Sequence, residues 1–178
     1  NIVTKILTPP KKPKLELFNI HSALEKVFAL SQVDKDGGLI LKRDYDPSIP
    51  EIYGDEDLFI QAILNIVKNA QQALLLTTNP VITIKSRVSY SQPINGNLHP
   101  TLCEVSIIDN GPGIPTDIQE QVFFPMVSSK EDGSGLGLSI SQDIIRIHGG
   151  AITFKTKSGE TAFSIQIPIK LNTEVQSA

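Results

Sequence analysis

The chain has 178 residues, of which 40% are hydrophobic and 20% are charged, and its formal net charge is −3. This length fits one globular domain, and the slight negative charge argues against a nucleic-acid-binding surface. The single cysteine, Cys103, excludes an internal disulfide and suits a reducing compartment, and no apolar run is long enough to span a membrane.

The first third of the chain predicts a linker, a helix and a strand. Residues 1–14 are rich in proline and lysine, which is typical of a linker. Apolar residues then recur at mostly helical spacing from Leu15 to Leu30, with Asn19 as a candidate N-cap. The alternation over residues 39–46 predicts a strand, and residues 47–54, with two prolines and a glycine, predict a turn region.

The middle third predicts a long helix followed by two strands. Asp55 is a candidate N-cap for a helix that runs to about Leu76, before a Thr-Thr-Asn-Pro run. Residues 82–88 and 102–109 predict strands. Residues 89–100 are rich in Ser, Asn, Gly and Pro, and they predict a loop between these strands.

The last third predicts a short helix around residues 117–122 and a longer helix from Leu136 to Ile147. Two glycines directly after His148 are suited to end that second helix. Residues 151–156 and 161–169 predict two strands that pair through a tight turn.

The order of these elements predicts the fold class. Helices are neither absent nor evenly interleaved with strands, which favours an α/β two-layer sandwich, with one mixed β-sheet and helices on one face. The domain is expected to occupy residues 15–170, and residues 171–178 are expected to form a disordered tail.

Two asparagines mark the long predicted helix. Asn65 and Asn69 are separated by four residues, so both amides project from one helix face. By themselves they fit a pair of satisfied polar groups at the helix surface equally well. An amide oxygen is also a hard ligand that can take one position around Mg²⁺, which makes Asn69 a candidate metal ligand.

A second motif follows the strand at residues 102–109. Asp109 ends this strand, and Gly111 and Gly113 give the following backbone the freedom to turn sharply beside a flat ligand. A carboxylate accepts hydrogen bonds, so Asp109 suits the exocyclic amine of adenine. An Asp-Asn-Gly turn is common, and the motif is weak when it is seen alone.

A third motif precedes the last helix and consists of Gly133, Ser134, Gly135, Leu136 and Gly137. Closely spaced glycines before a helix expose backbone N–H groups, which bind phosphate together with the helix dipole. The sequence lacks the Gly-Lys-Ser/Thr of a P-loop, and no strand directly precedes the glycines as a dinucleotide-binding fingerprint requires. A flexible hinge before a capped helix remains the alternative.

Residues 123–132 lie between the last two motifs, with an apolar front half and a polar back half. This pattern favours a lid that is fixed by aromatic side chains and has a mobile end. Lys130 is placed to reach a phosphate as a point charge, although it also fits a solvated loop lysine.

Taken in chain order, the four segments resemble the conserved boxes of the ATP-binding domains of the gyrase, Hsp90, histidine kinase and MutL family. NIVKNAQQAL resembles the N box, DNGPGIP the G1 box, VFFPMVSSK the F box and GSGLGLSI the G2 box. The resemblance covers roughly residues 15–170 and implies a Bergerat-type ATP-binding fold. The HGG run at residues 148–150 resembles the histidine-kinase branch, and the stretch FFPMVSSKEDGSGLGLSI resembles the nitrogen-regulation sensor kinases.

The resemblance implies a role for each motif. Asn69 would bind Mg²⁺ with Asn65 in support, and Asp109 would hold adenine in a pocket that Gly113 lines. The glycine-rich run from Gly133 to Gly137 would hold the phosphates of ATP, and Lys130 would be the lid cation. Many histidine kinases carry a basic residue and a tyrosine where this chain has Gln72 and Ala73; Lys68 is a further cation, although it need not point inward.

Position 65 distinguishes a kinase from a hydrolase in this family. The hydrolysing members carry a glutamate one helical turn before the metal-binding asparagine, whereas this chain carries Asn65. The γ-phosphoryl group is therefore expected to pass to a histidine. None of His21, His99 and His148 has the sequence context of an acceptor, so the acceptor is expected on a dimerising helical hairpin that precedes residue 1, with residues 1–14 as its exit.

The resemblance further implies partners and a location. We expect a cytoplasmic homodimer in the full-length protein, which phosphorylates an NtrC-type response regulator and responds to a PII-type signal protein. Neither nucleic-acid binding nor a membrane span is expected. Two alternatives remain: a nucleotide-sensing module that controls phosphatase activity or a PII-like partner without phosphoryl transfer, and an anti-sigma serine kinase of the same superfamily.

Overall fold

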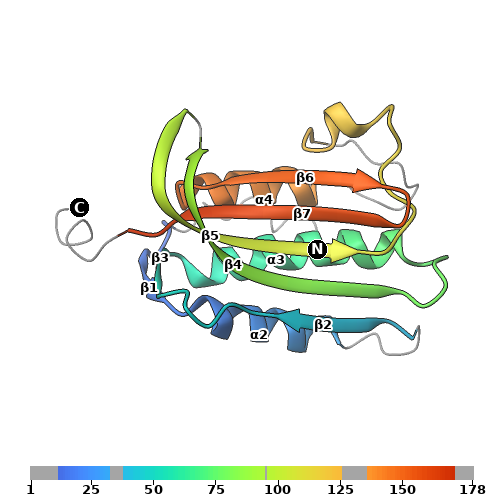
Figure 1. The fold of residues 1–178 in the computed structure, drawn as a ribbon, viewed down its shortest axis with the longest axis horizontal. Helices are drawn as coiled ribbons and strands as arrows, with labels where there is room; N and C mark the ends of the chain where they lie inside the picture. The colour runs from blue at the N-terminus through green and yellow to red at the C-terminus, as the bar shows by residue number, and fades with distance from the viewer. Residues whose placement is uncertain (1–11, 33–37, 95, 126–135, 171–178) are drawn as a thin grey trace.

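A five-stranded mixed sheet forms one layer of the domain (Figure 1). The computed structural model describes residues 12–32, 38–94, 96–125 and 136–170. Strand β2 (Ile40–Asp44) pairs in parallel with β4 (Val81–Ile94). The other strands are β5 (Asn97–Asp109), β6 (Ala151–Lys157) and β7 (Glu160–Pro168). The strand order is β2-β4-β5-β7-β6, and the pairs β4–β5, β5–β7 and β7–β6 are antiparallel.

Helices cover one face of this sheet, so the predicted two-layer sandwich is confirmed (Figure 1). They are α2 (Ile20–Ser31), α3 (Glu56–Ala73) and α4 (Gly137–Ile147). The core lies between the layers, where fully buried residues of α3 such as Phe59 and Ile66 share one cluster with the strand residues Ile84 and Ile107. None of the described helices is long and apolar enough to cross a membrane.

Both predicted N-caps are present. The side chain of Asn19 accepts hydrogen bonds from the backbone N–H groups of His21 and Ser22, and Asp55 accepts one from Leu58. Because an N-cap satisfies donors that have no partner within the helix, these side chains fix where α2 and α3 begin. Helix α3 ends at Ala73, three residues before the predicted end.

The prediction of helical spacing from Leu15 onwards and of a turn over residues 47–54 was partly wrong. A short strand β1 (Glu16–Phe18) pairs antiparallel with β3 (Ile52–Gly54) in a separate two-stranded sheet. The Asn19 cap prevents α2 from extending further towards the N-terminus. Phe18 then faces inward, with its ring centroid 5.6 Å from that of Phe59.

The predicted loop at residues 89–100 was also wrong, because β4 and β5 continue through it as a hairpin. Tyr90 is paired with Thr101, and Ile94 with Asn97. Gly96 has a φ of 82°, which suits the hairpin turn. The polar composition suggested a loop, but cross-strand pairing satisfies the backbone, and Ile94 is buried at the tip.

The other predicted elements are close to those observed. The short helix near residues 117–122 is a 3-10 turn, η2 (Gln119–Gln121), and the turn between β6 and β7 contains Gly159 with a φ of 84°. Of the predicted linker and tail, residues 1–11 and 171–178 lie outside the described residues.

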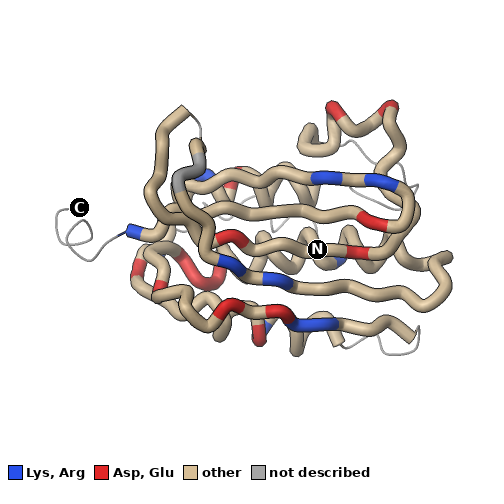
Figure 2. Tube along the Cα trace, in the orientation of Figure 1, with Lys and Arg blue, Asp and Glu red and all other residues tan. Residues whose placement is uncertain are grey.

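Charged side chains of both signs are interspersed over the described residues (Figure 2). Arg43 pairs with Glu25 at 2.7 Å, and Arg87 pairs with Asp44 at 2.7 Å, so two of the basic residues near β2 and β4 are partnered by carboxylates.

Candidate functional site

Helix α3 brings its two asparagines to the side that faces α4. Asn65 and Asn69 are both partly buried. The side-chain nitrogen Nδ2 of Asn65 donates a hydrogen bond to the backbone oxygen of Gly137 at 3.3 Å. A Cβ atom at position 137 would lie 3.7 Å from Cβ of Asn65, so the start of α4 lies directly against this side chain.

A buried serine fixes the spacing of α3 and α4. Ser141 is fully buried, and its hydroxyl lies 3.0 Å from the backbone oxygen of Ala62 on α3 and 2.9 Å from that of Gly137 on α4. The hydroxyl has one proton to donate, so the two carbonyl groups share it. The first turn of α4 is therefore held one helical turn from Asn69 along α3.

The first turn of α4 is suited to an anion. This helix has no side-chain hydrogen bond at its N-cap, Leu136, and no acidic residue in its first turn. Its first N–H groups lack partners within the helix, and the positive end of the helix dipole lies there. Leu136 at this end of the helix is 41% exposed.

Strand β5 delivers Asp109 to the end of the sheet, beside the C-terminal end of α3. The Asp109 side chain is 4% exposed, and its Oδ1 accepts a hydrogen bond from the backbone N–H of Gly111 at 2.9 Å. A Cβ atom at position 111 would lie 2.8 Å from this Oδ1 and 3.6 Å from the backbone oxygen of Ala73. Only glycine at position 111 therefore leaves the carboxylate undisturbed.

The second glycine of this loop lies against the turn between β6 and β7. Gly113 has a φ of 92°, and a Cβ atom there would lie 2.9 Å from the backbone oxygen of Lys157. The next residue, Ile114, donates its N–H to Oγ1 of Thr156 at 2.9 Å. The loop is fixed at one more point, because the N–H of Gly159 donates to the backbone oxygen of Gly111 at 3.0 Å.

Two residues next to Asp109 in the fold, Thr161 and Asn110, were not predicted from the sequence. Thr161 is 4% exposed and lies opposite Asp109 in the register of β5 and β7, and its hydroxyl lies 3.0 Å from that of Thr156. Asn110 accepts from the N–H of Val81 at 2.8 Å, which ties the loop to β4. Thr161 was detectable as the one polar residue among the inward-facing positions of β7, which are otherwise Phe and Ile.

Among the predicted site residues, Asn65 lies against Gly137 at the start of α4, which follows the N-cap Leu136, and Asn69 lies one turn further along α3. Asp109 and Gly111 lie beside Ala73 at the C-terminal end of α3, whereas Gly113 lies against Lys157 at the end of β6. The other predicted phosphate-binding residues, which are Lys130, Gly133, Ser134 and Gly135, lie outside the described residues. Lys68 is exposed and lies about 60° beyond Asn65 around the helix, 100° from Asn69.

The residues present fit an adenine nucleotide and Mg²⁺. The described residues include no group of three or more His, Cys, Asp or Glu side chains that could hold a metal ion by themselves. A metal at Asn69 would therefore take its other ligands from water and phosphate, as Mg²⁺ commonly does. The glycine at position 111 keeps the space beside the Asp109 carboxylate free of a side chain.

Comparison with protein families gives one match over residues 54–171, to a family described as histidine kinase-, DNA gyrase B-, and HSP90-like ATPases. The chain is 44% identical to the sensory histidine kinase/phosphatase NtrB of Vibrio alginolyticus, over 94% of this chain and 48% of that protein. It is 39% identical to NtrB of Salmonella typhimurium, over 96% of this chain and 48% of that protein. The chain spans about half the length of the curated relatives it matches.

Solved structures show the same arrangement of elements. The catalytic domain of the histidine kinase ThkA, in a nucleotide-free form, aligns with a TM-score of 0.74 and 27% identity, over 88% of this chain and 96% of that domain. ThkA in complex with the response regulator protein TrrA aligns with a TM-score of 0.73 and 26% identity, over 95% of this chain and 46% of ThkA.

Proposed function

Because the chain belongs to the family of histidine kinase-, DNA gyrase B- and HSP90-like ATPases, we propose that it binds ATP with Mg²⁺ and passes the γ-phosphoryl group to a histidine. The resemblance to this family and to the nitrogen-regulation sensor kinases, predicted from the four motifs, is confirmed by the family match and by the relatives named NtrB. The observation that carries the proposal is that helix α3, which bears Asn65 and Asn69, meets the start of α4 at Gly137 and the loop after Asp109 at Ala73.

The proposed nucleotide site assigns each element one task. The carboxylate of Asp109 accepts a hydrogen bond from the adenine amine, while Gly111 and Gly113 keep the space beside it open. The amide oxygen of Asn69 binds Mg²⁺, and the first turn of α4 with the preceding glycines binds the phosphates. The contacts of Asn65 and Ser141 hold the start of α4 against α3, so the residues that would hold the phosphates are fixed relative to the helix that carries Asn69.

The residue at position 65 favours phosphoryl transfer to a histidine over hydrolysis of ATP. Phosphoryl transfer depends mainly on positioning and on electrostatic stabilisation of the transferring group. Asn65 occupies the position where hydrolysing relatives carry a glutamate, and an amide is a poor base for activating water. The nucleophile is therefore a histidine of a helical hairpin outside this chain, which supports relay of the phosphoryl group to a response regulator.

The proposed partners and location come from the relatives. A neighbouring structure holds the histidine kinase ThkA with its response regulator, which supports a docked regulator for the full-length protein here, of the NtrC type. A PII-type signal protein, a homodimer and a cytoplasmic location are proposed from the same similarity. Residues 15–170 are proposed as the catalytic domain and residues 1–14 as the exit from the hairpin.

Phosphotransfer to a separate hairpin fragment tests the proposal. The chain would be incubated with γ-labelled ATP, Mg²⁺ and the hairpin fragment of the full-length protein, and acid-labile label on the hairpin would be measured. We expect label with the unaltered chain and little with Asn69→Ala, because the metal ligand is lost. Absence of label when ATP is bound would contradict the kinase assignment.

A second function is a nucleotide-sensing module that controls phosphatase activity. The relatives carry both activities in their name, sensory histidine kinase/phosphatase. In this case ATP would bind and close the site without transferring a phosphoryl group. Dephosphorylation of the response regulator that depends on ATP, with no labelled hairpin, would favour this alternative.

A further inference from the structure

The segment that precedes β1 is attached to the fold at a buried carboxylate. The backbone N–H of Lys14, two residues before β1, donates to Oδ2 of Asp55 at 2.7 Å. Asp55 is 9% exposed, and its Oδ1 accepts from the backbone N–H of Leu58 at 3.0 Å, so the same carboxylate caps α3. A buried charge is costly unless donors surround it. One side chain therefore holds both the segment before β1 and the start of α3.

His148 joins the start of α3 to the end of α4. The backbone N–H of Asp55 lies 3.0 Å from Nε2 of the ring, and Nδ1 lies 2.8 Å from the backbone oxygen of Ile144 in α4. Because a carbonyl oxygen can only accept, Nδ1 carries the proton and Nε2 accepts from Asp55. The ring is 6% exposed. One chain of hydrogen bonds thus runs from the backbone of Lys14 through Asp55 and His148 into α4.

The contact at His148 is the first of three that hold α4 against α3. The contacts of Ser141 and Gly137 with α3 follow it in antiparallel order along the two helices. An α-helix rises about 1.5 Å per residue, so Gly137 lies about 10 Å along α4 from Ile144. Packed helices slide against one another as units. A displacement of the end of α4 at His148 therefore reaches its first turn, where the phosphates are proposed to bind.

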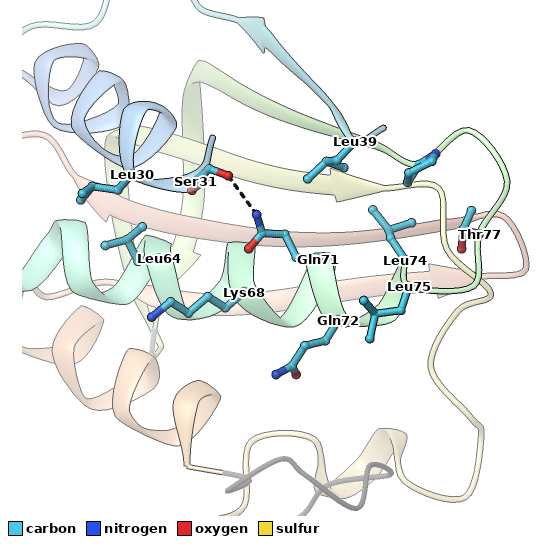
Figure 3. Close-up of a pocket in the computed structure, with 11 residues that line it drawn as sticks. Leu30, Ser31, Leu39, Leu64, Lys68, Gln71, Gln72, Leu74, Leu75 and Thr77 are labelled. Carbon is cyan, nitrogen blue, oxygen red and sulfur yellow. Dashed lines mark hydrogen bonds between the residues drawn. The ribbon is translucent and has the colours of Figure 1, made fainter. Parts of the chain in front are cut away.

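Helix α3 is the fixed member of this pair, since it is also held by α2 and by the sheet. Gln71 donates from Nε2 to the backbone oxygen of Ser31 at 3.1 Å, and Figure 3 shows this bond between α3 and the end of α2. Phe59 and Ile66 of α3 are fully buried in the core. A shift of the His148 ring is therefore expected to move α4, which has 11 residues, against the 18-residue α3.

We propose that Asp55 and His148 are positioning residues for the nucleotide site, and that through them the segment before β1 controls the affinity for ATP. The inference rests on the proposed nucleotide function. While the N–H of Lys14 is bonded to Asp55, the first turn of α4 is held in place relative to Asn69. When that bond breaks, Asp55 and the His148 ring shift, and α4 is displaced. Because residues 1–14 are proposed as the exit from the hairpin, a movement of the hairpin would reach the phosphates by this route.

Replacing Lys14 with proline removes the N–H donor, and NMR of the backbone amides without nucleotide shows how far the change extends. We expect shifted signals along α4, including Gly137 and Ser141. Asp55→Asn should shift the same signals, because asparagine still caps α3 but offers one acceptor oxygen where aspartate offers two. Shifts confined to β1, β3 and the first turn of α3 in both variants would overturn the proposal.

Calorimetric titration with ATP and Mg²⁺ measures the effect on the site. Lys14→Pro and Asp55→Asn should each weaken ATP binding about three- to tenfold, as expected for one lost hydrogen bond. The double variant should bind no more weakly than either single one, because both break the same bond. Glu16→Gln is the matched control. It removes the ion pair of Glu16 with Nζ of Lys14, at 3.1 Å, which Lys14→Pro also removes, and it should leave the affinity unchanged.

Two results of the titration would overturn the proposal. One is unchanged affinity in both Lys14→Pro and Asp55→Asn while the unaltered chain binds ATP, and the other is an equal loss in Glu16→Gln. Failure of the unaltered chain to bind ATP would contradict the proposed function, whereas the amide signals of α4, recorded without nucleotide, still decide whether Lys14 controls this helix.

Discussion

Replacing Gly54 with alanine tests how firmly His148 joins β3, α3 and α4. A Cβ atom at position 54 would lie 2.2 Å from Cδ2 and 2.6 Å from Nε2 of His148. The ring is 6% exposed and is held on both sides. Its Nδ1 donates to the backbone oxygen of Ile144 at 2.8 Å, and its Nε2 accepts from the backbone N–H of Asp55 at 3.0 Å. The added methyl group can be accommodated only if this ring moves.

The size of the effect follows from what the movement breaks. Each buried hydrogen-bonding group left without a partner costs about 1–3 kcal/mol, and the ring also packs edge-on against Phe59. Gly54 does not have a positive φ, so backbone strain adds nothing. We expect Gly54→Ala to lower the free energy of unfolding by about 2–4 kcal/mol. The asparagine-bearing helix α3 begins at this junction, because Asp55 is its N-cap.

A double-mutant cycle measured by urea denaturation isolates the steric cause. His148→Ala should cost about 2–4 kcal/mol by itself, through lost hydrogen bonds and a void. In that background the methyl group at position 54 enters space that the ring has vacated, so the double variant should be more stable than the sum of the single effects by at least about 1.5 kcal/mol. Additive effects within about 0.5 kcal/mol would refute the reasoning.

Three further predictions concern the loop glycine, one histidine and the cysteine. Gly113→Ala combines a positive φ with a clash against the oxygen of Lys157, so ATP affinity measured by calorimetry should fall about tenfold. The control Gly38→Ala, at a φ of 70° with no atom within 4 Å, should lower stability and leave ATP affinity unchanged; equal losses would contradict the role of the clash. Burial lowers the pKa of His21, so the unfolded chain binds a proton more readily. The free energy of unfolding should then fall as the pH drops below about 6.5, and less so in His21→Gln; identical pH profiles would contradict this. Burial raises the pKa of the Cys103 thiol to about 12, so a thiol reagent at pH 8 should react with the unfolded chain, and rapid reaction with the folded chain would be the contrary result.

The elements with a strong periodic pattern could be predicted from the sequence. The caps Asn19 and Asp55 and the alternation in β6 and β7 each depend on local chemistry, which a sequence displays directly. The β1-β3 pair could not be predicted, because its three-residue strands are joined by contacts between distant segments. The β4-β5 hairpin was missed for a related reason, since its polar residues suggest a loop until the cross-strand partners are known.

The candidate site shows the same division. Asn69, Asp109 and Gly113 could be proposed as site residues from the sequence because each belongs to a short motif whose residues are close in the sequence. Thr161 acquires its place only through the register of β7 against β5, and Ser141 only through the packing of α4 on α3. Residues such as these, which contact the site residues and not the ligand, are placed by tertiary contacts. In the sequence they can be recognised only as single polar residues on an otherwise apolar face.

Calorimetric titration of ATP in the presence of Mg²⁺ onto the unaltered chain and Asp109→Asn tests the central claim most directly. The substitution keeps the shape of the side chain and replaces one acceptor oxygen with a donor, which opposes the adenine amine. Glu104→Gln is the matched control, because Glu104 lies on the same strand and bonds to Gln166. We predict saturable binding that Asp109→Asn weakens about tenfold or more and Glu104→Gln leaves unchanged. Equal affinity of the unaltered chain and Asp109→Asn for ATP would contradict the account.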